Sequence, residues 1–206
     1  MVSAAGIVVD ENGVARCWWA AGTDEYMTYH DDEWGVAVHG EAWLYERLTL
    51  EAFQSGLSWL TILRKREGFR AAFAGFDAEA VAAFGEADIE RLMADTSIVR
   101  NRAKIRAAVT NAQAVVRLRE YGGLDELFWS FAPAGHRQPR TPADVPATTA
   151  ESIELAKTLK RNGFVFVGPT TAYAGMQACG LVNDHLAGCH RDGARLPRSA
   201  TRLPCR

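Results

Sequence analysis

Two pairs of cysteine and histidine at opposite ends of the chain constrain its fold more than any other feature. Cys17 and His30 form the first pair, and His185 and Cys189 form the second, near the other end of the 206 residues. Thiolate and neutral imidazole are good zinc ligands, and a structural zinc site closes with four ligands in tetrahedral geometry. If these four side chains bind one ion, the fold must bring the two ends of the chain together.

The spacing within each pair fits such a site. His185 and Cys189 are four positions apart, which predicts that both side chains lie on one face of a helical turn. Twelve residues separate Cys17 from His30, enough for an irregular loop to fold back and supply the other two ligands. Four available ligands favour a closed structural site, because a catalytic zinc needs an open position.

An alternative to zinc stays open, because this spacing is less specific than two CxxC motifs. Cys189 can be a buried apolar thiol, and His30 or His185 can be a hydrogen-bonded core histidine. His190 is the main rival ligand, since it directly follows Cys189. A zinc deaminase is not indicated, because the chain lacks the P-C-x-x-C motif of those enzymes.

The composition is that of a soluble globular protein, with 48% hydrophobic and 23% charged residues. No apolar run approaches the ~20 residues of a membrane span, and the first residues lack a secretory signal pattern. We therefore expect a cytoplasmic protein without a membrane partner. The four cysteines are too few and too scattered for a disulfide framework.

The overall charge gives no general attraction to nucleic acid, since the net charge is −2 and the pI is about 6.2. Basic residues are nevertheless clustered at 64–70, 100–106 and 191–206. Each cluster could bind phosphates, but solvated helix faces and a loose end explain them equally well by composition alone.

The pattern of apolar residues and helix caps predicts an all-α protein. Residues 1–13 are expected to be a flexible extension, 132–149 an irregular loop and 191–206 a flexible Arg-rich tail, with 14–190 as one domain. The only strand-like run is 164–169. Helices are predicted over 41–67, 85–96, 102–121, 124–131, 150–163 and 170–180, and a further one is predicted to begin after an N-cap at Asp77. The first is expected to break at Gly56, and the helix over 150–163 is expected to end at Gly163.

The segment 50–67 carries the most unusual chemistry. Glu51 and Trp59 lie in an apolar helical pattern, while Trp19, Tyr26 and Tyr29 crowd the stretch between the first two candidate ligands. A carboxylate beside aromatic rings can hold a flat cationic ring through stacking, cation–π attraction and hydrogen bonds. Taken alone, these residues are more simply explained as an aromatic core with a solvated or capped carboxylate.

Eight blocks, in order, resemble the 3-methyladenine DNA glycosylase I family of base-excision repair enzymes. The resemblance covers about residues 15–190, and eight ordered blocks are far more specific than any one of them. The blocks are RCWW, YHDDEWGV, LEAFQSGLSWLTILRKRE, SIVRNRAKI, LFWSF, FVFVGPTTAY, MQACGLVNDH and GCH.

The resemblance implies a helix-hairpin-helix glycosylase of two packed helical lobes with one structural zinc. Its zinc ligands match the four side chains of the two terminal pairs, so the ion would join the N- and C-terminal segments. Its base pocket matches Glu51 and Tyr29, to which we assign the catalytic role, and the binding residues Trp19, Trp59 and, more weakly, Tyr26.

The resemblance also implies where DNA binds. The hairpin is expected at 94–105, where backbone N–H groups with Arg100, Arg102 and Lys104 nearby can bind phosphate without regard to sequence. Gly56 and Leu57 match the segment that enters the gap left by the displaced nucleotide, and an apolar wedge can unstack a duplex in this way.

The expected activity is that of a monofunctional, monomeric glycosylase, which hydrolytically excises 3-methyladenine from alkylated double-stranded DNA. It would release the free base and leave an abasic site. Methylation at N3 already makes the base a cation and a good leaving group, so flipping and binding it are the main tasks. Two other readings remain, a non-catalytic zinc-stapled module that binds alkylation damage and a zinc-dependent hydrolase of a small molecule.

Overall fold

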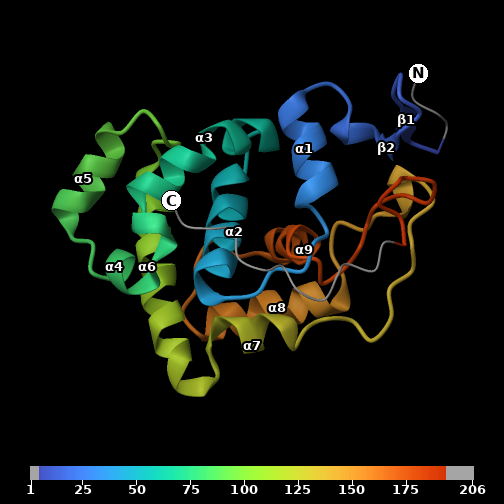
Figure 1. The fold of residues 1–206 in the computed structure, drawn as a ribbon. Helices are drawn as coiled ribbons and strands as arrows, with labels where there is room; N and C mark the ends of the chain where they lie inside the picture. The colour runs from blue at the N-terminus through green and yellow to red at the C-terminus, as the bar shows by residue number, and fades with distance from the viewer. Residues whose placement is uncertain (1–4, 194–206) are drawn as a thin grey trace.

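Helices dominate this computed structural model, which describes residues 5–193 (Figure 1). A two-stranded antiparallel hairpin lies before them, with β1 (Ile7–Val9) paired to β2 (Ala15–Cys17) so that Ile7 is opposite Cys17. Single turns of 3₁₀ helix lie at Trp18–Ala20, Ala74–Phe76, Arg119–Tyr121 and Pro142–Asp144. The α-helices of the described residues are α1 (Asp24–Asp32), α2 (Glu41–Gln54), α3 (Trp59–Ala72), α4 (Ala78–Ala82), α5 (Glu86–Ala94), α6 (Arg102–Leu118), α7 (Gly123–Trp129), α8 (Ala150–Arg161) and α9 (Pro169–Ala178).

Side-chain caps fix where several helices begin, which is why the sequence predicts most of them. Asp77 accepts hydrogen bonds from the N–H groups of Glu79 and Ala80, at 2.9 and 3.0 Å, and starts α4 as expected. Asn101 accepts from the N–H of Lys104 at 3.1 Å and starts α6. The predicted break at Gly56, where φ is +83°, separates α2 from α3.

Helix α2 forms the centre of the core and packs against α3, α6, α7 and α9. Its residues 44–53 are buried all round. Phe53 meets Phe69 of α3 edge to face with ring centroids 4.7 Å apart, and the stacked rings of Phe73 and Phe76 extend this aromatic cluster. Because α2 is buried on every side, any polar side chain on it needs an explanation.

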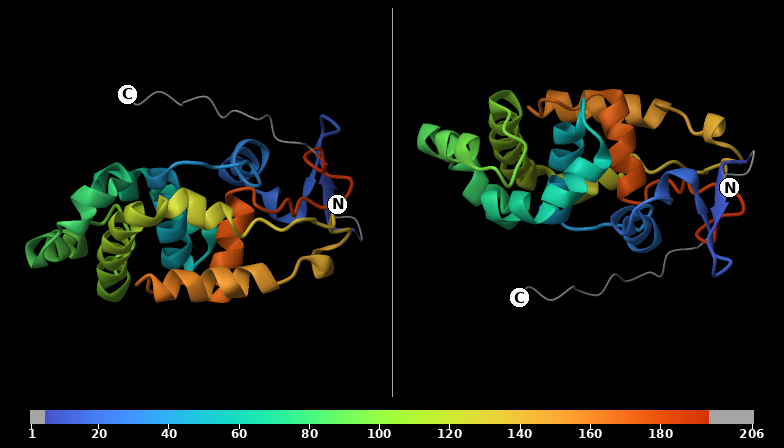
Figure 2. Two further views of the ribbon diagram at one scale, coloured as in Figure 1. Left: turned by 90° about the horizontal axis from the view of Figure 1, so that it is seen from below. Right: turned by 90° about the horizontal axis from the view of Figure 1, so that it is seen from above.

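The two ends of the described chain lie side by side at one end of the molecule. The hairpin lies against the segment that follows α9, and Figures 1 and 2 show them together on the side away from α4 and α5. The N–H of His190 donates to the carbonyl of Ala15 at 2.8 Å. Leu186, Cys17 and Cys189 form a small buried cluster there, apart from the main core.

The hairpin corrects the prediction of a flexible extension over 1–13 for residues 5–13, since 1–4 lie outside the described residues, and it makes the fold mostly helical instead of all-α. Asp10 accepts hydrogen bonds from the N–H groups of Asn12 and Val14, both at 2.9 Å, and Gly13 adopts φ of +79°. This D-E-N-G turn joins the strands, and it was the sequence signal for a hairpin.

Residues 164–169, the one strand-like run of the sequence, form no strand. Asn111, buried on α6, accepts from the N–H of Val165 at 2.8 Å and donates to its carbonyl at 3.1 Å. A side-chain amide thus takes the place of a neighbouring strand. Of the Arg-rich tail, residues 191–193 form a turn and 194–206 lie outside the described residues. No helix in the described part is long and apolar enough to cross a membrane.

Candidate functional site

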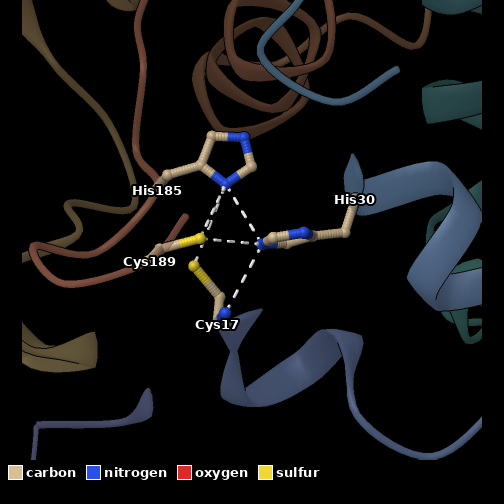
Figure 3. Close-up of side chains that lie close together, drawn as sticks. All are labelled: Cys17, His30, His185 and Cys189. Atoms are coloured by element: carbon tan, nitrogen blue, oxygen red, sulfur yellow. Dashed lines mark hydrogen bonds between the residues drawn. The ribbon is translucent and has the colours of Figure 1, made fainter. Parts of the chain in front are cut away.

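The two terminal pairs meet in one buried cluster (Figure 3). Cys17 ends β2, His30 comes from α1, and His185 and Cys189 come from the segment after α9. Each side chain contributes one potential ligand atom, and these four atoms lie within 4.8 Å of one another. His30 Nε2 is 3.1 Å from His185 Nδ1, and Cys189 Sγ is 3.4 Å from His30 Nε2 and 3.7 Å from His185 Nδ1.

These separations fit a tetrahedral ion. Zinc bonds of about 2.3 Å to sulfur and 2.0–2.1 Å to nitrogen place neighbouring ligand atoms roughly 3.3–3.8 Å apart. Cys17 Sγ is 4.0 Å from His185 Nδ1, so only a small movement would be needed to close the site. Two cysteines and two histidines form a donor set typical of structural zinc.

Hydrogen bonds outside the cluster leave its inward atoms free to bind an ion. His30 Nδ1 is 2.7 Å from the Asp31 carboxylate, and His185 Nε2 is 3.0 Å from the carbonyl of Trp34. Both acceptors hold the ring proton on the outer nitrogen, so the lone pairs of the inner nitrogens face the centre. Partners of this kind orient metal-binding histidines.

The sulfur atoms are held in a similar way. Backbone N–H groups of Leu186 and Arg191 donate to Cys17 Sγ and Cys189 Sγ, at 3.3 and 3.4 Å. A hydrogen bond from the Cys17 thiol lowers the pKa of the Cys189 thiol despite its burial. Thiolate is the form of cysteine that binds metals.

The prediction of a helical turn at His185 and Cys189 is wrong, although the two side chains do lie close together as it implied. The described chain has no helix after α9, and Gly188 has φ of +92°. A tight turn, in which the N–H of Cys189 donates to Leu186 at 2.9 Å, brings Cys189 back toward His185. His190, the rival ligand, lies outside the four, with Nδ1 2.9 Å from the Ala15 carbonyl and Nε2 3.3 Å from Asp31.

The residues predicted for the base pocket also come together, beside the cluster of two cysteines and two histidines. Tyr29 of α1 lies between Trp19 and Trp59, with ring centroids at 6.3 and 5.4 Å. Trp19 also contacts His30, at 5.1 Å between ring centroids, so the aromatic group lies directly beside the cluster of cysteines and histidines. Tyr26 lies 6.0 Å from Trp19, but its hydroxyl accepts from the N–H of Leu60 at 3.1 Å, which fixes the start of α3.

Glu51 is the exceptional residue of this group. Its side chain is buried on α2, with 6% exposure, and burial raises the pKa of its carboxyl to about 8 against an opposing effect of Arg47. In the described residues no hydrogen bond to this carboxylate is found, and Trp59 Nε1 is fully buried without a partner. Buried polar groups nearly always have partners, so unpaired ones beside aromatic rings mark a site for a polar, planar ligand.

The loop between α2 and α3 projects next to this group. Residues 55–58 are exposed, and Leu57 keeps 40% of its surface accessible. The Nζ of Lys104 on α6 donates to the carbonyls of Phe53 and Ser55, at 2.9 and 2.6 Å, and thereby holds the end of α2. The expectation that Lys104 binds phosphate is therefore corrected, because its side chain is buried and committed to this loop.

The other two basic residues of the expected hairpin differ from each other. Arg102 forms ion pairs with Glu90 at 2.6 Å and Glu86 at 3.3 Å. Arg100 is exposed and forms no ion pair within residues 5–193. Of the three, Arg100 is thus the one most available for a phosphate.

Comparison with known proteins agrees with this geometry. The model of the methyladenine glycosylase family matches residues 19–192. The chain belongs to this family. The DNA-3-methyladenine glycosylase 1 of Escherichia coli (strain K12) is 45% identical over 180 residues, which cover 84% of this chain and 95% of that protein.

Solved structures resemble the methyladenine glycosylase fold seen here. One, a 3-methyladenine DNA glycosylase I, has a TM-score of 0.82 and 44% identity and covers 85% of this chain and 98% of its own. Another, a variant of a 3-methyladenine DNA glycosylase I in complex with 3-methyladenine, has a TM-score of 0.78 and 35% identity, with 82% and 93% covered.

One set of residues beside the pocket was missed by the sequence analysis. Arg47, Glu33 and Arg66 form a connected group of ion pairs in this methyladenine glycosylase, with Arg47 Nη2 2.7 Å and Arg66 Nη1 2.6 Å from Glu33 Oε2. The signal was available, because Arg47 precedes Glu51 by four positions and must share its face of α2.

Proposed function

We propose that this methyladenine glycosylase excises 3-methyladenine from alkylated DNA and leaves an abasic site. The buried carboxylate of Glu51, without a hydrogen-bond partner among the described residues and close enough to Tyr29 to influence it electrostatically, carries the proposal. A methylated purine is planar, positively charged and able to donate from its edge, so it would satisfy this carboxylate. The names of the relatives and the bound base of one solved relative support the same substrate.

The chemistry follows from the charge of the damaged base. Methylation at N3 weakens the bond to the sugar, because the base leaves as a neutral molecule, and no acid is needed to protonate it. Flipping the nucleotide costs a few kcal/mol, and a damaged base reduces this cost. Glu51 accepts hydrogen bonds from the flipped base, Tyr29, Trp59 and Trp19 enclose it, and water attacks the cationic sugar. No side chain is assigned to orient that water.

The DNA is proposed to lie over the exposed α2–α3 loop and the turn between α5 and α6. Leu57 would fill the gap left by the flipped nucleotide, on a loop held by Gly56 and Lys104. Residues 95–101 would then be the hairpin of a helix-hairpin-helix unit. Its backbone N–H groups at the start of α6 and the unpaired Arg100 would meet phosphates.

The four-residue cluster is proposed to hold one zinc ion with a structural role. Cys17, His30, His185 and Cys189 supply the ligands, and when bound the ion would clamp the hairpin to the segment after α9. Support comes from the outward hydrogen bonds of both imidazoles, which leave the inner nitrogens unprotonated. Native mass spectrometry of protein purified without chelator should show one zinc; a metal-free, fully folded protein would overturn the assignment.

Release of methylated bases tests the activity. DNA treated with N-methyl-N-nitrosourea is incubated with the wild type or with Glu51→Gln, and the freed bases are resolved by chromatography. We expect 3-methyladenine from the wild type and only background from the variant, with 7-methylguanine and hypoxanthine left in the DNA. Binding of alkylated DNA without any base release would instead identify a damage-binding module. A cytoplasmic location and a monomeric state stay predictions.

A further inference from the structure

Arg47 is a buried cation that the proposed chemistry does not use. Its residue is 5% exposed, on the most buried helix of the protein. One of its nitrogens, Nη2, donates to Glu33, while Nε and Nη1 are buried and have no partner. Leaving polar groups buried and unpaired costs stability, and an apolar side chain of similar length would avoid this. The burial of the Arg47 charge at this position is therefore better explained by function than by stability.

That position is close to the residues assigned to base recognition. Arg47 lies one helical turn before Glu51 on α2, so both side chains leave the helix on the same face. Its guanidinium carbon is 5.9 Å from the centroid of the Tyr29 ring. The Arg47 guanidinium is thus close to both Tyr29 and Glu51, the two residues assigned to recognition. No hydrogen bond connects it to the Glu51 carboxylate.

Among the described residues, the other groups near Glu51 do not supply a second unpaired positive charge. Burial raises the pKa of Tyr29 on α1 and brings that of Cys179, after α9, to about 12, so both are neutral at physiological pH. Glu33, which follows α1, is an anion, and Arg66 of α3 is bound to it through two nitrogens, at 2.6 and 2.8 Å. The positive charge of Arg66 therefore offsets the negative charge of Glu33. The charge of Arg47 is then the net positive charge that acts on Glu51.

We propose that Arg47 is a positioning residue of the base site, whose charge favours the anionic form of Glu51 inside the core and so helps to set the lower pH limit of base excision. Burial favours the protonated carboxyl, and a nearby positive charge favours the carboxylate. Only the carboxylate can both offset the charge of the base and accept from its edge. This inference rests on the proposed function, because it assumes that Glu51 meets a cationic base.

The test is the pH profile of kcat/KM for 3-methyladenine release, which reports groups of the free enzyme. Wild type, Arg47→Met and Arg47→Lys are compared between about pH 5.5 and 10.5, with spontaneous loss of base subtracted. Loss of a neighbouring positive charge raises the pKa of a carboxyl by about one unit or more. We expect the acid limb of Arg47→Met to move up by at least that much, and Arg47→Lys to restore part of the shift.

Leu48→Ala is the matched control, since Leu48 is the next residue on α2, is buried and carries no charge. It should lower stability without moving the acid limb. An Arg47→Met profile that is lower at every pH but keeps the wild-type limb would show a merely structural role and would overturn the inference. Arg47→Gln serves as a second neutral variant if the methionine variant does not fold.

A second measurement separates this inference from the proposed activity. The carboxyl ¹³C shift of Glu51 is followed against pH in labelled, metal-loaded protein and assigned by its loss in Glu51→Gln. A higher midpoint in Arg47→Met than in wild type supports the inference even if no base is released. Equal midpoints overturn it, whereas a wild type that releases no 3-methyladenine overturns the proposed activity alone.

Discussion

Glu51 is costly to the fold in its ionised form. Its carboxyl is buried on α2, and burial raises its pKa from an ordinary 4.5 to about 8. In the unfolded chain this group loses its proton near its ordinary pKa, whereas in the fold it keeps the proton to higher pH. Unfolding therefore releases a proton between these two values, and stability falls as pH rises through that range.

Replacing Glu51 by glutamine should consequently stabilise the protein while abolishing base excision. At pH 5 the two proteins should have nearly equal free energies of unfolding, because wild-type Glu51 is protonated. Toward pH 8 the variant should become more stable, by an amount on the order of a few kcal/mol. Denaturant unfolding at several pH values measures this difference; a difference that does not change with pH would contradict a raised pKa.

Asp31 is a second residue at which a substitution can be tested, and its carboxylate also accepts hydrogen bonds from Arg16. Its carboxylate holds the outer nitrogen of His30 at 2.7 Å, so Asp31→Asn should weaken zinc binding by about 10- to 100-fold. Asp32→Asn is the matched control, since Asp32 is exposed on the same helix. Competition with a chromophoric chelator measures both affinities, and equal affinities would show that Asp31 does not orient the ligand.

At the scale of elements, the break between α2 and α3 places an apolar side chain in solvent. Gly56 permits the sharp turn with its φ of +83°, and Lys104 fixes the carbonyls on its N-terminal side. The loop is thus exposed yet tied to α6. A loop of this kind can enter a duplex without first becoming ordered, which saves conformational entropy on binding.

Leu57→Ala should lower kcat/KM on alkylated duplex DNA by about tenfold or more, because the cost of unstacking is then less well offset. The melting temperature should change little, since Leu57 is 40% exposed. Ile153→Ala, which is 36% exposed on α8, is the control and should retain full activity. If both variants keep the wild-type rate on duplex DNA, the α2–α3 loop is not the wedge.

Helix positions could be predicted from the sequence because caps and periodicity are local. The N-cap at Asp77 and the break at Gly56 both lie where they were expected. The absent strand at 164–169 could not be predicted in this way, because its backbone is bound by Asn111, more than 50 residues away. Local β propensity gives no information about which partner the backbone will find.

In the candidate site, too, some residues could be predicted from the sequence and others could not. The four candidate metal ligands could be named from residue type and spacing, and a resemblance supported Glu51 and its aromatic neighbours. The buried role of Lys104 and the ion pairs of Arg102 depend on which elements pack together, and sequence patterns do not show this. Basic residues at a helix start look alike in a sequence whether they face phosphate or carbonyl oxygen.

At the scale of the whole molecule, the cluster of two cysteines and two histidines joins the hairpin and α1 to the segment after α9. Cys189→Ala should lower the melting temperature and release the ion, because zinc bound only by the folded protein adds to its stability. Differential scanning fluorimetry with and without a chelator measures both effects. The variant should no longer respond to the chelator; a variant as stable as the wild type would show that the ion is dispensable.

The separation of the metal cluster from the main core has a consequence for the order of folding. His30 and His185 meet across 155 residues of chain, and closing so long a loop early would be entropically unfavourable. The helices from α2 to α9 share a core that excludes all four ligands, so this core can form first. The proposed zinc would then bind as one of the last events, and protein folded without it would have a helical core whose two terminal segments are not joined.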